Sequence, residues 1–106
     1  MTKYVLFYVG GGMPETEEES AKVLKAWEDW FTDLGPAVVD GGYPFSPMAK
    51  SVASDGTIKD GPAGTMSSGY SIVEAESLDA AAEMAKGCPN LASGGEVSIF
   101  ETIEVM

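Results

Sequence analysis

Residues 69–75 read Gly69-Tyr70-Ser71-Ile72-Val73-Glu74-Ala75, and this run decides how the rest of the chain is arranged. The two alternating sets of side chains in the run both contain apolar residues, so neither side of a strand built from it would be clearly polar. A strand of this kind is covered on both faces and lies in the middle of a sheet. The run Lys3–Val9 has the same property and predicts a second central strand.

Two segments predict the helices that follow these strands. The first runs from Pro14 to Leu34, with Thr16 and Glu19 at the spacing of a capping box. Its apolar face is expected to comprise Leu24, Trp27, Phe31 and Leu34. The second helix follows Ser77 as its cap. Its buried stripe is expected to comprise Leu78, Ala81, Ala82 and Ala85.

Shorter segments complete the predicted order of elements. Ala37–Asp40 predicts a short strand, and Glu96–Val105 predicts the last one. Between them, Asp55-Gly56 is the residue pair that a type I′ hairpin turn favours, with strands on either side at 48–54 and 57–59. The order is β-α-β, hairpin, β-α-β. It predicts an α+β, ferredoxin-like antiparallel sheet with both helices on one face.

The two helices can cover only one face of that sheet, because the second is short and rich in alanine. The central strands carry apolar residues on both faces, so the other face needs a partner. A second copy of the chain is the simplest partner. The sequence therefore predicts a homodimer whose sheets pack face to face.

Length and charge exclude several classes of protein. The 106 residues predict a single domain, 1–106, and the formal net charge of −11 disfavours nucleic acid and acidic membranes as partners. The chain has no arginine to clamp a phosphate and no histidine to act as a base or metal ligand. We therefore expect no cofactor and no metal.

The same composition carries an expectation about the compartment. No apolar run approaches the ~20 residues of a membrane span, and the N-terminus has no pattern of a secretory signal. The single cysteine, Cys88, excludes an internal disulfide. These features predict a cytoplasmic protein.

Several short motifs follow one another at a characteristic order and spacing. They are Gly41-Gly42, Asp60-Gly61-Pro62, Gly69–Ala75, Ser77–Ala81, Gly87-Cys88-Pro89 and Gly94-Gly95. Through them the chain resembles the YCII-related family, in the branch named for an Asp-Gly-Pro-Phe motif, over nearly its whole length. The resemblance implies a ferredoxin-like dimeric α/β barrel, and some members of the family are regarded as enzymes.

The chain departs from that family in three places. Ala63 stands where the motif has phenylalanine, and residues 64–68 replace a stretch that usually carries glutamate and lysine. The helix histidine proposed as catalytic in the YCII proteins has no counterpart here. An acid–base mechanism built on that histidine therefore does not carry over.

Two carboxylates are candidates for acid–base chemistry. Glu101 shares a face of the last predicted strand with four apolar residues, where burial would raise its pKa. The alternatives are a β-bulge that turns it to water or a residue that protects a sheet edge. Asp60 is the second candidate, with a simple turn residue as the alternative. A cleft with aromatic walls and a few polar groups is expected from Tyr8, Asp40, Tyr43, Phe45 and Tyr70.

Two other features favour plain structural roles. Gly10-Gly11-Gly12 lies between a strand and a helix, but four glutamates open that helix and oppose a bound phosphate, so a turn is the better interpretation. Cys88 follows the C-terminal end of a helix, where the dipole disfavours a thiolate. A buried residue in a tight turn is the better interpretation of this cysteine.

Two functions fit the sequence. In the first, the chain binds a small apolar or neutral organic molecule and either only binds it or catalyses a cofactor-independent acid–base reaction with carboxylates and tyrosines. In the second, the chain is a non-catalytic binding or assembly module. An enzyme should enclose a pocket with at least one buried carboxylate, whereas a module should keep its carboxylates in water and fill its cavities with side chains.

Overall fold

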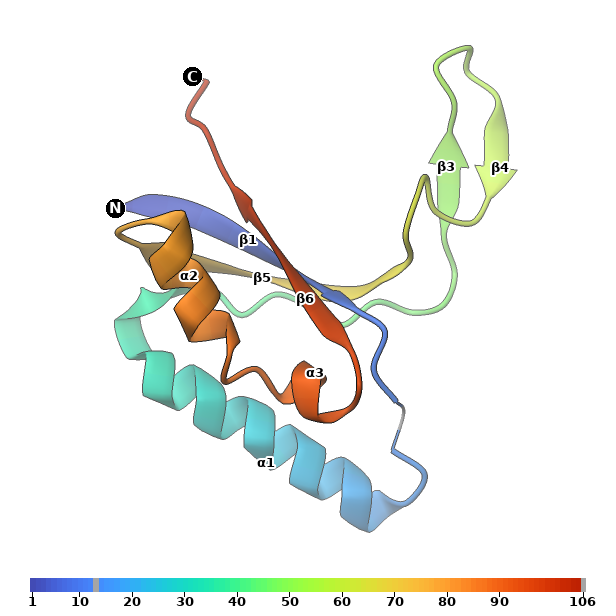
Figure 1. Cartoon of the computed structure of the whole chain (residues 1–106). Coiled ribbons are helices and arrows are strands. Elements are labelled where there is room, and N and C mark those ends of the chain that lie inside the picture. Colours follow the sequence, from blue (N-terminus) through green and yellow to red (C-terminus); the bar gives the residue numbers. More distant parts are fainter. Residues whose placement is uncertain (13, 106) are drawn as a thin grey trace.

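An antiparallel sheet organises the α+β fold of the residues that the computed structural model describes, 1–12 and 14–105 (Figure 1). Its central strands are β1 (Thr2–Val9) and β5 (Ser67–Ala75), which pair with each other along nearly their whole length. The prediction that these two runs lie at the centre is confirmed.

Two shorter strands flank the central pair. β2 (Val38–Asp40) pairs with β5, and β6 (Glu96–Glu101) pairs with β1. The resulting order is β2-β5-β1-β6, with every neighbouring pair antiparallel. This order is compatible with a ferredoxin-like fold.

The last strand is shorter than predicted, because it ends at Glu101 and not at Val105. Thr102 still donates two hydrogen bonds to the carbonyl of Lys3, through its backbone nitrogen at 3.1 Å and its hydroxyl at 2.7 Å. Lys3 is the second residue of β1, so β6 has reached the end of the strand beside it. Ile103 and Val105 are consequently exposed.

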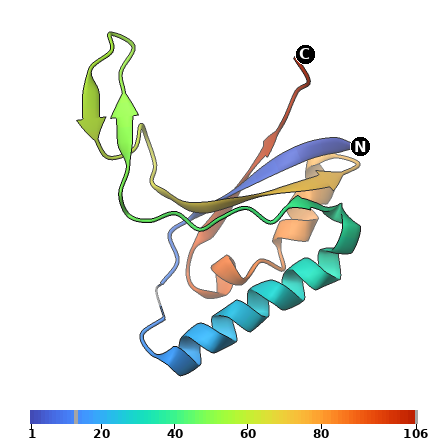
Figure 2. The same ribbon diagram turned by 180° about the vertical axis from the view of Figure 1, so that it is seen from behind.

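All three helices lie on the same side of the sheet, as the two opposite views show (Figures 1 and 2). They are α1 (Glu17–Leu34), α2 (Leu78–Ala85) and the short α3 (Pro89–Ala92). A single 3-10 turn, Gly35–Ala37, joins α1 to β2. α3 was not predicted, although a proline at its first position is a typical helix start.

Both long helices begin with the predicted caps. The Thr16 hydroxyl accepts a hydrogen bond from the Glu19 backbone nitrogen at 3.0 Å, and the Ser77 hydroxyl accepts one from Ala80 at 3.0 Å. The prediction that the first helix starts at Pro14 is wrong by three residues. Thr16 has extended backbone angles, so the helix starts after it.

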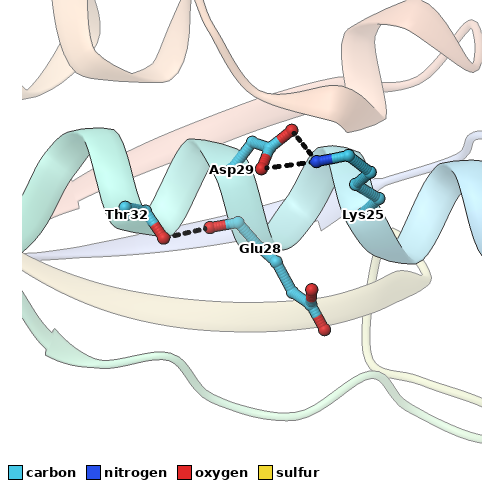
Figure 3. Close-up of polar contacts among 4 residues, drawn as sticks. All are labelled: Lys25, Glu28, Asp29 and Thr32. Atoms are coloured by element: carbon cyan, nitrogen blue, oxygen red, sulfur yellow. Dashed lines mark hydrogen bonds and ion pairs between the residues drawn. The ribbon is translucent and has the colours of Figure 1, made fainter.

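The exposed surface of α1 is polar and contributes little to holding the helix in place (Figure 3). Lys25 donates to both carboxylate oxygens of Asp29 at 3.1 and 3.2 Å, and the Thr32 hydroxyl donates to the backbone carbonyl of Glu28 at 2.8 Å. Exposed pairs one turn apart stabilise a helix by only about 0.3–0.5 kcal/mol. The apolar face of α1 therefore anchors it.

The hydrophobic core fills the space between the sheet and the helices. It consists of Tyr4, Leu6, Tyr8, Trp30, Val73, Ala75, Ala81 and Cys88. The three residues from β1 alternate along the strand, as period-two side chains on one face must. Trp30 is fixed by a hydrogen bond of 3.2 Å from its indole nitrogen to the carbonyl of Met84.

Two leucines expected in the core are not there. Leu24 is 62% exposed, and Trp30, which was not assigned to the core, is buried in its place. Leu24 lines a cavity that separates this part of α1 from the sheet, which explains its exposure. Leu78 is also exposed, so the buried stripe of α2 is confined to Ala81 and Ala85.

The face of the sheet opposite the helices carries an apolar cluster and has no covering layer within the described chain. We call this cluster the uncovered sheet face, and its members are Val5, Phe7, Tyr70, Ile72 and Phe100. Polar residues lie at the ends and edge of the same face, namely Lys3, Glu74, Glu96 and Ser98. Register places Val5 opposite both Ile72 and Phe100. The rings of Phe7 and Phe100 meet edge to face, with centroids 5.7 Å apart.

A separate hairpin extends from the body, on the side of the sheet away from the helices (Figures 1 and 2). Its strands are β3 (Lys50–Val52) and β4 (Ile58–Asp60). A hairpin was predicted here with strands at 48–54 and 57–59, so the first strand is shorter than predicted, the second extends to Asp60, and the turn is not type I′. Gly56 has a positive φ of 90° and Asp55 does not, whereas a type I′ turn needs both. The Gly56 nitrogen donates to the carbonyl of Ala53. This bond is typical of a three-residue hairpin loop with glycine at its left-handed position.

The length and hydropathy of the described helices differ from those of a membrane span. Among residues 1–12 and 14–105, none is both long and apolar enough to cross a bilayer. The longest of them, α1, carries charged residues along its whole outer surface.

Candidate functional site

A cavity of about 410 Å³ lies between α1 and the helix-facing side of the sheet. It is bounded on one side by the stretch of α1 from Val23 to Phe31, and on the other by the end of β1 and the start of β5. Two glycine-rich loops, 10–12 and 41–44, form its rim. Elements far apart in the sequence thus converge on one hollow.

Aromatic rings form the wall of the cavity. Tyr8 and Trp27 meet edge to face with ring centroids 4.9 Å apart, and Trp27 lies 5.9 Å from Phe31. Leu24 and Tyr43 also line the cavity and are 62% and 72% exposed, which places them where it opens to solvent. The wall offers flat apolar surface to an occupant.

Two buried hydroxyl groups are joined at the base of the cavity. The Tyr8 hydroxyl donates to Ser71 Oγ at 2.6 Å, and the Ser71 hydroxyl donates to the backbone carbonyl of Gly41 at 2.6 Å. Burial raises the pKa of the Tyr8 phenol far above its usual range, although the hydrogen bond with Ser71 opposes that effect. Tyr8 therefore stays a neutral phenol at physiological pH.

The carbonyl of Gly41 is held in place by the turn that follows it. Gly42 adopts a φ of +74°, and a Cβ atom there would lie 1.8 Å from the carbonyl oxygen of Tyr70. The Asp40 carboxylate accepts a hydrogen bond of 2.8 Å from the Gly42 nitrogen. Glycine at 42 and a short polar side chain at 40 are thus what this loop needs.

Asn90 fastens the opposite rim. Its amide nitrogen donates to the carbonyls of Val9 at 3.3 Å and Glu96 at 2.9 Å, which ties α3 to the ends of β1 and β6. A Cβ atom at Gly11 would lie 2.5 Å from Asn90 Oδ1. The loop therefore approaches the asparagine more closely than any residue with a side chain would allow.

Within the described residues, no carboxylate and no ammonium group lines the cavity. Its polar atoms come from hydroxyl, amide and backbone groups. A charged occupant would lose its hydration without gaining an opposite charge, and this is costly. The cavity is consequently suited to a neutral molecule.

The structure brings together only some of the predicted ligand-binding residues. Tyr8, Tyr43 and Tyr70 line the cavity, whereas Asp40 and Phe45 do not. Asp40 instead shapes the rim. Phe45 packs on the Tyr70 ring at a centroid distance of 5.9 Å.

The two predicted catalytic carboxylates both lie outside the cavity. Asp60 sits in the hairpin, where its exposed carboxylate pairs with Lys50 at 2.6 Å. Glu101 is exposed at the end of β6, opposite Tyr4 of β1. Burial raises the pKa of the Tyr4 phenol, and the nearby charge of Glu101 raises it further.

Sequence reasoning missed the groups that shape the site most. Ser71 stood out only as a small polar residue inside a strand covered on both faces, and nothing marked Asn90. Their partners lie 63 and 81 residues away, so the pairing is a property of the fold alone. Gly10-Gly11-Gly12 forms a loop, and the Gly12 nitrogen donates a hydrogen bond of 2.9 Å to the carbonyl of Ser93.

The structure buries Cys88, as the structural interpretation predicted. Burial raises the pKa of its thiol to about 11. A thiol of this kind is almost wholly protonated at neutral pH and is a poor nucleophile.

Stability is expected to fall as pH rises above about 9, because the folded state keeps protons that the unfolded state releases. The pKa values of Cys88 and Tyr8 are both raised in the folded state, so the stabilisation from their retained protons is complete below pH ~8. As pH rises, the contribution of the Cys88 thiol is lost before that of the Tyr8 phenol. The thiol accounts for roughly 2 kcal/mol of the loss by pH 11. Urea unfolding between pH 8 and 11 should show that the free energy of unfolding declines less steeply for Cys88→Ala than for the unchanged chain. Equal slopes would show that Cys88 does not cause the decline.

A scan against protein-family models finds none that matches this chain, and a search of the curated proteins finds no match either. The cavity and the uncovered sheet face are therefore the features from which a function can be inferred.

Proposed function

We propose that the chain binds a small, neutral organic molecule in the cavity between α1 and the sheet. The observation that carries the proposal is an uncharged, aromatic-walled hollow of about 410 Å³ with a fixed pair of hydroxyl groups at its base. Ligand sites are typically apolar concavities of about 300–1,000 Å³ with a few placed polar groups. The cavity has both the size and the composition of such a site.

Binding without catalysis is the form of this proposal that the side chains support best. Glu74 is half-buried and every other carboxylate in the described residues is exposed, so no buried carboxylate serves the cavity. Acid–base chemistry there would rest on Tyr8, whose phenol is held neutral. Replacing Glu101 by Gln or Asp60 by Asn should accordingly leave ligand affinity unchanged.

A thermal-shift screen of neutral aromatic compounds tests the proposal. A ligand at about 100 times its Kd stabilises the folded state by ~2.7 kcal/mol, which raises Tm by several degrees in a chain of this size. Leu24→Trp places an indole at the cavity mouth and should abolish the shift. Ala21→Trp adds the same ring to the same helix outside the cavity and should preserve it. A hit that Leu24→Trp leaves unchanged would place binding elsewhere.

We also propose that two copies pack through their uncovered sheet faces. Five apolar side chains lie on this surface, Phe100 exposed and the other four half-buried, and such a cluster is what a stable interface buries. The residues involved come from three strands, and Phe100 alone is 53% exposed in the single chain. A second copy has this same surface and would meet it in a symmetric arrangement.

The hairpin supports the same assembly. An isolated pair of strands is marginally stable in water, and β3–β4 carries exposed apolar residues at its paired positions Val52 and Ile58. It extends on the side of the sheet away from the helices (Figure 2). A copy seated on the uncovered sheet face would lie beside the hairpin and give it something to pack against.

The third proposal is that the chain is a YCII-related protein and that the pair of copies forms a dimeric α/β barrel. The strand order β2-β5-β1-β6 and the helices on one side support it. The motif segment Gly69–Ala75 lies within β5, and Asp60 ends β4. In such a barrel the two uncovered sheet faces would be turned toward each other.

A further inference from the structure

The hydroxyl and amide groups at the base and rim of the cavity have used their donor hydrogens on the protein itself, whereas the indole N–H of Trp27 on the wall donates to no group of the described chain. The Ser71 hydroxyl bonds a backbone carbonyl, which has no hydrogen to give, so Ser71 must be the donor in that contact. Ser71 has a single hydrogen. Tyr8 must therefore be the donor in the contact between the two hydroxyl groups.

The other polar side chains on the rim follow the same pattern. The Ser68 hydroxyl donates to the carbonyl of Tyr8 at 3.0 Å. The Asn90 amide nitrogen has two hydrogens, and its two bonds to the carbonyls of Val9 and Glu96 use both. What these residues can still present to an occupant is oxygen.

Two further tyrosines keep their hydroxyl groups away from the base of the cavity. Tyr43 is 72% exposed, so its hydroxyl lies in water at the cavity mouth. The ring of Tyr70 packs against Phe45, and its register position puts it beside Phe7 on the uncovered sheet face. Neither hydroxyl supplies a donor to the base of the cavity.

We infer that the ligand is a neutral ring compound carrying an O–H or N–H group, which donates to the hydroxyl oxygen of Tyr8. This inference rests on the proposed binding function and names the class of ligand. The phenolic oxygen keeps an acceptor position after donating its hydrogen to Ser71. The aromatic wall formed by Trp27 and Phe31 receives the ring.

A pair of probes with one shape separates donor from non-donor ligands. Indole has an N–H donor, and benzofuran has an oxygen in the same position and no donor. Calorimetric titration of the whole chain should show that indole binds roughly three- to tenfold more tightly, the range expected for one net hydrogen bond.

Three variants assign the effect to Tyr8. Tyr8→Phe removes the acceptor and should bring the affinity ratio close to one. Ser71→Ala removes the group that accepts the Tyr8 hydrogen, so Tyr8 becomes able to donate and the ratio should shift toward benzofuran. Thr32→Val removes an exposed hydroxyl from α1 outside the cavity and should leave the ratio as it is.

The outcomes separate this inference from the proposal beneath it. Failure of both probes, and of every neutral aromatic compound in the screen, would overturn the binding function itself. Equal binding of indole and benzofuran by the unchanged chain would overturn only the donor assignment. So would a preference for indole that persists in Tyr8→Phe, and this variant keeps the test decisive even where Ser71→Ala does not fold.

Discussion

Replacing Gly42 by alanine is expected to destabilise the folded chain by about 3 kcal/mol or more. The added Cβ atom would lie 1.8 Å from the backbone oxygen of Tyr70 and 2.7 Å from its carbonyl carbon. These are backbone atoms of a central strand and cannot move aside as a flexible side chain would. The positive φ of 74° adds strain of its own for a residue with a side chain.

The neighbouring glycine provides a matched control. A Cβ atom at Gly41 meets nothing within 4 Å, and Gly41 is not among the glycines with positive φ. Gly41→Ala should therefore change the free energy of unfolding by no more than about 0.5 kcal/mol. Urea denaturation of both variants gives the comparison. Similar losses of free energy of unfolding in the two variants would mean that the contact between a Cβ atom at residue 42 and the Tyr70 backbone does not determine the cost.

The same pair of variants connects stability to the site. Gly42 follows Gly41, whose carbonyl accepts the Ser71 hydrogen. The Asp40 carboxylate fixes this turn by accepting a hydrogen bond from the Gly42 nitrogen. A shift of this loop would take the acceptor away from the Ser71 hydrogen and leave it able to donate to the Tyr8 oxygen, where the ligand is expected to bind. Gly42→Ala should therefore weaken ligand binding as well as folding, whereas Gly41→Ala should preserve folding.

The central strands were predictable because their signal is local. Period-two alternation with apolar residues on both sides can be seen within seven to nine residues, and it correctly placed β1 and β5. The capping side chains of Thr16 and Ser77 were predictable for the same reason, because each bonds a nitrogen three residues away.

The choice between Leu24 and Trp30 was not local. Helical periodicity places both near the apolar side of α1. Trp30 is buried because it packs into the core, where its indole nitrogen bonds the carbonyl of Met84, 54 residues further on. Leu24 lies above a hollow that the sequence does not reveal. The tyrosines of the site were predictable as aromatic residues near loop glycines. The hydrogen-bond directions at its base depend on Gly41 and Ser71, which meet only in the folded chain.

One strand serves both proposed roles. Tyr8 on β1 faces the cavity, and Phe7, its neighbour in sequence, belongs to the uncovered sheet face. β5 divides its side chains in the same way, with Ser71 toward the helices and Ile72 away from them. The apolar character of both faces, which first marked these strands as central, is thus explained by a ligand site on one side and a proposed interface on the other.

Phe100→Glu is expected to convert a dimer into monomers by raising its Kd at least about 100-fold. The ring of Phe100 contacts Phe7 and is 53% exposed in the single chain, so the substitution leaves the monomer's core intact. In a symmetric dimer it would place two carboxylates in an apolar interface, in chains that already carry a net charge of −11 each. Size-exclusion chromatography with light scattering measures the change directly.

Leu78→Glu is the control for this variant. Leu78 is 47% exposed, close to the value for Phe100, but it begins α2 on the helix side of the sheet. Leu78→Glu adds the same charge at the first turn of a helix, where a carboxylate is tolerated, and should leave the dimer intact. A stable monomer of the unchanged chain at micromolar concentration would refute the face-to-face assembly. Dissociation by Leu78→Glu, with Phe100→Glu still dimeric, would instead assign the interface to the helices.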